Sequence, residues 1–383
     1  MNNFDKKNWQ KIKFGDIVKE VRVAEHKPLK NSLSRYVGLE HIESEDLHIT
    51  SWEDITDGTT FTRKFVEGQV LFGRRRAYLK KAALADFDGI CSGDILVFET
   101  IKDKLLPELL PFIVQNDNFF QFAVDASAGS LSPRVKFKDL AKFELMLPKS
   151  LDEQKKLSDL LWAGDELVQK YIKEFDSIQI YKNKYFRENY QLDSSNKKVK
   201  ISSLFELNPS KEKLSNNQLV SFISMEDVTE DGIIENKTDR KYEEVSTGYK
   251  SFINGDILFA KITPCMENGK GAIASNLTNG FGFGSTEFHI LRPINDSDRP
   301  YLYHLSQSPF FRWLAERQMT GSAGQKRVPS DFLLNFKLSL PSLEKRIEIG
   351  NKMSEFDQIL ELINKNITVT KLVNDSIKNE IFS

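Results

Sequence analysis

An internal duplication is the feature that most constrains how this chain folds. The segment "GSLSPRVKFKDLAKFELMLPKSLDEQKK" at residues 129–156 resembles "GSAGQKRVPSDFLLNFKLSLPSLEKR" at residues 321–346. Both begin with Gly-Ser, pass through a short polar stretch to Arg-Val, and continue through a hydrophobic segment to Leu-Pro, an acid and a base. Because the two segments lie about half a chain length apart, a repeat of the whole chain has to be considered first.

Further matched blocks support a duplication that runs nearly from end to end. The segment "KFVEGQVLFGR" at residues 64–74 closely matches "SFINGDILFAK" at residues 251–261. The other pairs occur in the same order in both halves: residues 11–21 with 198–207, 36–42 with 222–228, 80–85 with 269–274, 91–98 with 284–291 and 119–122 with 310–313. Chance would produce one or two such matches, so we interpret each half of the chain as one copy of the same unit.

Each copy has the pattern of a mixed α/β domain. "GQVLFG" and "GDILFA" are short apolar runs that follow a turn, which is typical of buried strands. Residues 105–125 and 299–318 predict helices interrupted by proline. A last strand is predicted to end near Pro148 in the first copy and near Pro341 in the second.

A long helix is predicted after each Leu-Pro. Residues 151–190 contain no proline, and apolar side chains recur there every three or four positions; residues 344–382 repeat that pattern. A helix of about 38 residues is roughly 57 Å long and extends beyond a domain of about 150 residues. Its apolar stripe therefore needs a partner. We predict an antiparallel, coiled-coil-like pair, with two unrelated surface helices as the alternative.

These patterns predict four segments with pseudo-two-fold symmetry. Residues 1–148 form a first domain and residues 149–190 a central long helix. Residues 191–341 form a second domain of similar fold, and residues 342–383 form a C-terminal long helix.

The composition is that of a soluble globular protein. Hydrophobic residues make up 40% of the chain and charged residues 28%. No apolar run approaches the roughly 20 residues of a membrane span, and the start "MNNFDKKNWQ" lacks the apolar core of a signal peptide. Two cysteines, Cys91 and Cys265, fit a reducing compartment. We therefore expect a cytoplasmic protein.

Motifs of common catalysts are absent from the sequence. It has no Walker loop, no HExxH, no GxSxG and no Cys/His cluster, and "LNPS" at residues 207–210 is not the Asn/Asp-Pro-Pro-aromatic motif of an amino-methyltransferase. The glycines of "NGFGFGS" at residues 279–285 imitate a cofactor loop, but we interpret this segment as a turn before a strand. We therefore expect no catalytic residue, no metal site and no bound cofactor.

Basic residues are concentrated locally although the net charge is only −1. Residues 40–57 carry seven acids and no lysine or arginine, whereas residues 61–81 carry seven bases and one acid. Local positive charge attracts phosphate, and arginine also suits bidentate contact with guanine. For each residue, a solvated surface charge is the alternative. The predicted nucleic-acid contacts are Arg74, Arg75, Arg76, Lys80 and Lys81 in the first copy, and Lys261 and Lys270 in the corresponding loop of the second.

The chain resembles the DNA-specificity subunits of type I restriction-modification systems. The resemblance covers essentially the whole chain and rests on the duplicated layout and on the paired Gly-Ser…Leu-Pro segments, each followed by a long helix. The Leu-Pro…Glu-Gln element of that family is complete in the first copy, which has Gln154. The second copy departs from it, because Lys345 stands where glutamine is usual.

The resemblance implies a function and a set of partners. Each domain would be a target-recognition domain that reads one half of a bipartite, asymmetric site in double-stranded DNA. The paired helices would fix the spacer between the halves and dock two methyltransferase (modification) subunits, which restriction/translocase subunits would join. S-adenosylmethionine, ATP and Mg²⁺ would bind to those partners. This chain would carry no active site and contact no membrane.

Two other functions remain open at this point. A stand-alone DNA methyltransferase or nuclease would need motifs that the sequence lacks. A scaffold of two domains on a coiled-coil spacer would bind protein and not DNA.

The paired Gly-Ser…Leu-Pro segments then mark the junction between each domain and its helix. The Gly-Ser pairs at residues 129–130 and 321–322 are expected to form loops. Arg134, Lys326 and Arg327 join the predicted DNA contacts. For Arg134 and Arg327, packing against the long helix is the alternative.

Overall fold

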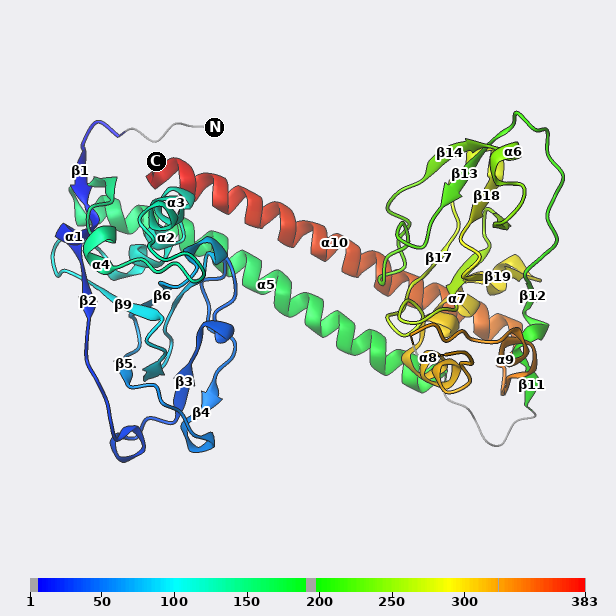
Figure 1. Cartoon of the computed structure of the whole chain (residues 1–383), viewed down its shortest axis with the longest axis horizontal. Coiled ribbons are helices and arrows are strands. Elements are labelled where there is room, and N and C mark those ends of the chain that lie inside the picture. Colours follow the sequence, from blue (N-terminus) through cyan, green and yellow to red (C-terminus); the bar gives the residue numbers. More distant parts are fainter. Residues whose placement is uncertain (1–5, 191–197, 323, 383) are drawn as a thin grey trace. The chain divides into compact units, whose positions relative to one another are not determined.

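The computed structural model describes residues 6–190, 198–322 and 324–382 (Figure 1). The chain divides into two compact units: Met1–Lys173 with Asn364–Ser383, and Glu174–Ile363. Each long helix therefore contributes residues to both units. We call the part of each unit outside the long helices the first domain and the second domain.

The first domain contains two four-stranded sheets and a short pair of strands. One sheet has the order β2-β9-β6-β7 and the other the order β4-β3-β8-β5, in which β3 and β8 are parallel. The short pair joins β1 to β10. The strands are β1 (Trp9–Lys13), β2 (Val18–Val21), β3 (Arg35–Val37), β4 (Glu53–Asp54), β5 (Arg63–Phe65), β6 (Val70–Gly73), β7 (Ala82–Leu84), β8 (Gly89–Cys91), β9 (Ile95–Thr100) and β10 (Glu144–Pro148).

The second domain repeats this topology strand for strand. Its sheets have the orders β12-β19-β16-β17 and β14-β13-β18-β15, with β13 and β18 parallel, and β11 pairs with β20. The strands are β11 (Val199–Lys200), β12 (Phe205–Leu207), β13 (Leu219–Ile223), β14 (Thr238–Lys241), β15 (Lys250–Ile253), β16 (Ile257–Ala260), β17 (Gly271–Ile273), β18 (Phe281–Gly284), β19 (Phe288–Pro293) and β20 (Lys337–Leu338). The predicted duplication and mixed α/β class are confirmed.

The apolar runs of the sequence occupy the centre of one sheet in each domain. β6 and β16 are buried along their whole length, and each pairs on both sides with antiparallel strands. In the first domain the ring of Phe72 stacks on Phe98 and Phe120, with ring centroids 5.5 and 5.6 Å apart. These aromatic contacts join the sheet to the helices that cover it.

Short helices cover these sheets. The predicted interruption by proline is found in the second copy, where Pro309 begins α8 and Ser308 accepts a hydrogen bond from the Phe311 amide at 3.1 Å. In the first copy Pro111 lies in the first turn of α2, and the break between α2 and α3 is at Asn116, which caps α3. The helices are α1 (Phe14–Ile17), α2 (Leu110–Val114), α3 (Asp117–Asp125), α4 (Phe137–Leu140), α6 (Tyr242–Val245), α7 (Arg299–Gln307), α8 (Pro309–Glu316) and α9 (Ser330–Asn335).

The two long helices are α5 (Leu151–Asn189) and α10 (Leu343–Phe382). In the first unit the beginning of α5 and the end of α10 enter the same core, through Leu157 and Leu161 on one helix and Ile381 on the other. In the second unit the end of α5 meets the beginning of α10, where the rings of Tyr185 and Phe356 lie 5.9 Å apart. Opposite ends therefore meet in each unit, which confirms the antiparallel pair.

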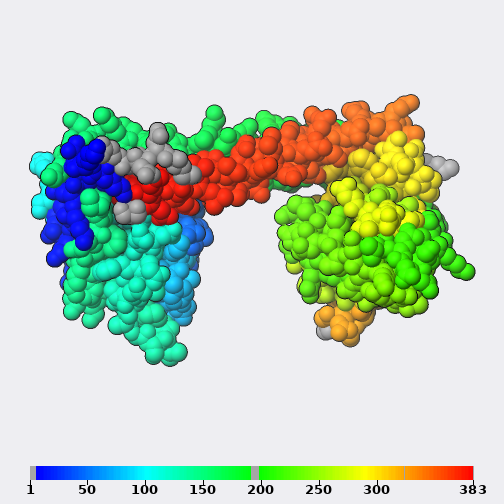
Figure 2. All heavy atoms as spheres, turned by 90° about the horizontal axis from the view of Figure 1, so that it is seen from above, coloured from blue at the N-terminus to red at the C-terminus, as the bar shows by residue number. Residues whose placement is uncertain are grey.

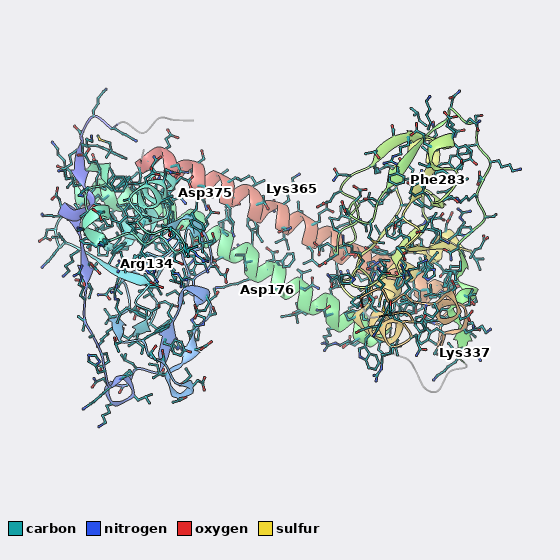
Figure 3. All side chains as sticks on the ribbon, in the orientation of Figure 1. Arg134, Asp176, Phe283, Lys337, Lys365 and Asp375 are labelled. Atoms are coloured by element: carbon teal, nitrogen blue, oxygen red, sulfur yellow. The ribbon has the colours of Figure 1, made fainter. Side chains whose placement is uncertain are left out.

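One interpretation of the sequence was wrong. The segment Phe281–Gly284, which we interpreted as part of a turn, is strand β18 in the middle of a sheet, and Figure 3 labels its Phe283. A single turn of 3₁₀ helix at Thr278–Gly280 precedes the strand. A side chain at Gly282 would overlap the ring of Phe252, so this glycine allows close packing between neighbouring strands.

None of the helices within the described residues has a stretch long and apolar enough to cross a membrane.

Candidate nucleic-acid interface

The Gly-Ser…Arg-Val segments form a short hairpin in each domain. We call residues 128–134 finger 1 and residues 320–327 finger 2; residue 323 lies outside the described residues. Ala128 and Arg134 exchange two backbone hydrogen bonds of 3.1 and 2.9 Å, and Thr320 and Arg327 do the same at 3.0 and 2.9 Å. Figure 2 shows each finger protruding from its own domain, finger 1 in teal and finger 2 in orange.

An arginine–carboxylate pair anchors the base of each finger. Arg134 donates two hydrogen bonds to Asp94, at 2.7 and 3.1 Å, and Arg327 donates two to Glu287, both at 2.9 Å. Asp94 and Glu287 stand immediately before the equivalent strands β9 and β19. The hydrogen bonds from arginine hold the pKa of both carboxyl groups below their ordinary range. For both arginines packing against a long helix was the alternative expectation; the polar partners found for their guanidinium groups include these carboxylates.

Backbone hydrogen bonds attach the fingers to equivalent positions of the two sheets. The Val135 amide donates to the Arg74 carbonyl at 3.0 Å, and the Val328 amide donates to the Lys261 carbonyl at 2.8 Å. The backbone amides of Arg74 and Lys261 in turn donate to the backbone carbonyls of Asp94 and Glu287, both at 2.9 Å. Two sequence-predicted residues, Arg74 and Lys261, are therefore structural equivalents at the base of the fingers.

The three consecutive arginines of the first copy have different environments. Arg75 lies 3.5 Å from Asp94 and donates to the Ser132 hydroxyl of finger 1 at 3.3 Å. The Nε of Arg74 is buried without a hydrogen-bond partner, and burial, together with the nearby Arg63, lowers its pKa. Arg76 is exposed, and no hydrogen bond or ion pair with another described residue holds its side chain.

Arg74 lines a pocket beside finger 1 that sequence reasoning missed. The pocket has a volume of about 330 Å³ and also contains Leu96 and Phe137. Glu20, the one acid among its lining residues, lies 2.6 Å from the Arg22 guanidinium. We call the cations of this pocket basic corner 1: Arg22, Arg63, Arg74, Lys136 and Lys138. Lys136 and Lys138 follow the Arg-Val of finger 1, and that proximity was the available sequence signal.

The second domain carries positive charge at the equivalent place. Lys250 begins β15 as Arg63 begins β5, and burial together with Lys261 and Lys211 lowers the pKa of Lys250. His289 lies beside them and contacts the Val328 carbonyl at 2.8 Å through Nε2; burial lowers its pKa to about 4. We call Lys211, Lys250 and Lys261 basic corner 2; His289 is its neutral neighbour. Its mutually repelling ammonium groups favour binding of an anion.

Other predicted residues already have partners inside the domains. Lys80 pairs with Glu45 at 2.6 Å and Asp117 at 2.7 Å, and these hydrogen bonds raise its pKa to about 12. Lys81 donates to the Leu39 carbonyl at 2.8 Å, and Lys270 donates to the carbonyl of Met225 at 3.2 Å.

Lys81 and Lys270 therefore occupy equivalent places and hold equivalent loops. Lys326, by contrast, is exposed on finger 2, and no partner among the described residues holds its side chain.

Neither domain shows a metal centre in the described parts of the chain, where no group of three or more His, Cys, Asp or Glu residues is arranged to hold an ion. Both cysteines are free thiols, Cys91 buried in the first domain and Cys265 partly buried in the second. The chemistry available at the fingers is thus that of cations and hydrogen-bond donors, which suits binding of polyanions.

A known family matches both copies. The family described as the type I restriction modification DNA specificity domain matches residues 6–174 and residues 194–371. The specificity subunit of the type I restriction enzyme EcoAI from Escherichia coli is 42% identical over 165 residues. These residues are 42% of this chain and 27% of that protein, so the matched stretch spans about a quarter of the relative's length.

Solved structures share the fold at low sequence identity. The S subunit of a type I restriction-modification system from M. genitalium has a TM-score of 0.63 at 13% identity, covering 100% of this chain and 98% of the other. A structure concerned with complex assembly and conformational transition of the type I R-M system has a TM-score of 0.57 at 19% identity, covering 98% and 97%. With both copies matched by one family, the chain belongs to the type I restriction modification DNA specificity domains.

Proposed function

We propose that this chain is the DNA-specificity subunit of a type I restriction-modification complex. Each domain reads one half of a bipartite, asymmetric site in double-stranded DNA. One observation carries this proposal: a finger and a basic corner occur at the same place in both domains but are built from different side chains. A shared scaffold with different contact groups is what two different half-sites require.

The basic corners differ in the chemistry that they present to DNA. Arg63 and Arg74 in the first domain have Lys250 and Lys261 as their counterparts in the second. A guanidinium group makes bidentate contacts with guanine or phosphate, whereas an ammonium group acts as a point charge. The two domains therefore recognise different sequences, and the whole site is asymmetric.

The predicted contact residues divide into direct contacts and supports. Arg76 and Lys326 are exposed beside and on the fingers, which supports a role for them in contacting phosphates or base edges. Arg75, Arg134 and Arg327 anchor the fingers through carboxylates and turn their exposed edges toward DNA. Arg74 and Lys261 belong to the basic corners, and the other three predicted residues, Lys80, Lys81 and Lys270, shape the loops through their internal partners.

The long helices fix the spacer and dock two methyltransferase subunits. In the first unit α10 exposes Leu372 at 65% and Val369 at 50% of their surfaces, and in the second unit α5 exposes Ile180 at 67%. These exposed apolar side chains of α10 and α5 support one docking surface for a methyltransferase subunit on each unit. S-adenosylmethionine, ATP and Mg²⁺ belong to the methyltransferase and restriction/translocase partners, and this subunit contributes no catalytic group.

Mapping of methylated adenines tests the proposal. The chain is expressed with an adenine methyltransferase subunit, and the methylated sites are compared with those of a variant in which residues 1–148 come from a relative. The expected change is confined to one half of the site. A matched exchange of residues 191–341 should change the other half only. Changes in both halves, or methylation by the purified chain alone, would refute modular recognition by a non-catalytic subunit.

A second measurement separates DNA recognition from the scaffold alternative. Binding of the assembled complex to its mapped site is measured as the salt concentration rises. Neutralised phosphates produce a steep salt dependence, with a slope of about −0.9 per contact. Complexes that assemble normally but show no salt-dependent retention of DNA would favour the scaffold.

A further inference from the structure

Finger 1 carries a highly exposed apolar side chain, Leu131, at its tip. Leu131 is 90% exposed, the largest exposed fraction among the large hydrophobic side chains of the described residues. It stands between Ser130 and Ser132 at the tip of the hairpin. Exposure of a single leucine is common on protein surfaces, so its significance depends on how firmly the finger holds it.

The finger is built as a rigid support. Two backbone hydrogen bonds close it between Ala128 and Arg134, and the Arg76 amide donates to the Pro133 carbonyl at 2.9 Å. Gly129 has a φ of +116°, a conformation that glycine adopts without strain, and Pro133 restricts the returning strand. The paired hydrogen bonds from Arg134 to Asp94 attach the finger to the sheet. Leu131 is therefore presented in a defined position.

The surroundings of the finger match the major groove of DNA. The groove is about 12 Å wide and admits a two-stranded β ribbon, and finger 1 is a hairpin closed by a single bridge between its ends, Ala128 and Arg134. Cations flank the base of the finger: Arg75 and Arg76 on the preceding loop and Lys136 directly after it. In a finger inserted into the groove, these cations would lie near the phosphates at the groove edges and the leucine at the tip would face the bases. The one apolar feature that bases present in the major groove is the thymine 5-methyl group.

We propose that Leu131 packs against a thymine methyl group in the half-site read by the first domain. This inference rests on the proposed function and assigns a specificity-determining residue to it. Finger 2 differs at the corresponding turn, where Gln325 and Lys326 precede its arginine. The two fingers thus use different chemistry, an apolar contact in the first domain and polar contacts in the second.

Replacement of thymine by deoxyuridine isolates this contact because it removes only the methyl group. After the methylated site has been mapped, each thymine on either strand is replaced in turn, and binding of the assembled complex is measured. One position in the half-site of the first domain should weaken binding about four-fold, which corresponds to about 0.8 kcal/mol for one buried methyl. Replacements in the other half-site should not depend on Leu131.

Variants of the finger complete a double-mutant cycle. Leu131→Ala should weaken binding to the thymine duplex roughly ten-fold and abolish the four-fold effect of deoxyuridine, because both changes remove the same contact. Leu131→Met keeps an apolar tip and should retain most of the affinity. Ser322→Ala on finger 2 is the matched control and should leave the deoxyuridine effect intact. Unchanged thermal unfolding of the variants checks the fold.

Several results would overturn the inference without touching the proposed function. Three results would refute the contact: a half-site without thymine, no deoxyuridine position that weakens binding, or equal binding of wild type and Leu131→Ala. A loss of methyltransferase assembly in Leu131→Ala would make this leucine part of a protein interface. An increase in 2-aminopurine fluorescence that depends on Leu131 would indicate insertion between bases. Failure of the wild-type complex to prefer any DNA sequence would instead overturn the proposed function itself.

Discussion

Acidification should destabilise the second domain selectively, because two of its buried histidines fold in the neutral form. His289 and His304 are 3% and 5% exposed. Burial lowers the pKa of each to about 4, although Asp357 lies 3.6 Å from His304 and favours its charged form. In the unfolded chain each histidine has a pKa near 6.5. The unfolded state therefore binds more protons between pH 6.5 and pH 4, and stability falls as the pH falls through this window.

The size of the effect follows from these two pKa values. A histidine with a pKa of about 4 when folded and about 6.5 when unfolded loses roughly 2 kcal/mol of stability between pH 7 and pH 5. The two together lower the unfolding free energy of the second domain by about 4 kcal/mol. In the first domain His48 behaves in the opposite way, because a 2.8 Å hydrogen bond to Asp165 raises its pKa. The stability that His48 contributes to the first domain is fully present below pH 6.5, and it is lost as the pH rises through the pKa of the folded state.

Urea unfolding with a domain-specific readout measures this difference. Samples equilibrated at pH 7 or pH 5 receive a short hydrogen-exchange pulse at one fixed pH, and peptide masses report each domain separately. The unfolding midpoint of the second domain should fall more than that of the first. The variant His289→Asn/His304→Gln should lose most of this pH dependence. A midpoint that is unchanged by pH, or that falls equally in this variant, would refute the assignment of the effect to the two histidines.

Three further substitutions probe the interface and its supports. Arg76→Gln should reduce the salt slope of DNA binding by about 0.9 without lowering the melting temperature; an unchanged slope would mean that Arg76 contacts no phosphate. Asp256→Gln leaves Arg292 without its paired hydrogen bonds, both 2.8 Å, and should cost about 2–4 kcal/mol in urea unfolding. Adding Arg292→Glu recreates the Gln–Glu pair found at the equivalent place in the first domain and should restore at least about 1 kcal/mol; no recovery would show that the pairs are not interchangeable. Lys270→Met should destabilise the second domain by about 1 kcal/mol while the specific methylation pattern persists, and a changed pattern would make Lys270 a DNA contact.

The regular elements were predictable because their patterns are local. Buried strands such as β6 and β16 are apolar runs after turns, and the long helices carry a stripe at helical spacing. Comparison of the two copies made those assignments firmer, since each pattern appears twice. Strand β18 was missed because its glycines are typical of turns, and the reason for them is the neighbouring ring of Phe252.

The candidate site was predictable only in part, because its partners come from distant segments. Arg134 and Arg327 were singled out, but each pairs with a carboxylate 40 residues earlier that no local pattern connects to it. Arg22 and Arg63 join Arg74 in one pocket only through the order of the strands. Whether a basic side chain was free could not be inferred at all. Lys80 and Arg76 look alike in the sequence, yet only Lys80 has carboxylate partners.

The antiparallel helices also have a consequence for biosynthesis. The core that contains Phe14 and Val18 includes Ile381 and Phe382, which are 0% and 2% exposed. During translation these early residues emerge long before the last turn of α10 is made. The first domain therefore stays incompletely sealed while the whole second domain is being synthesised. We expect a product that stops before residue 381 to expose apolar residues of the first domain and to be recognised by chaperones or proteases.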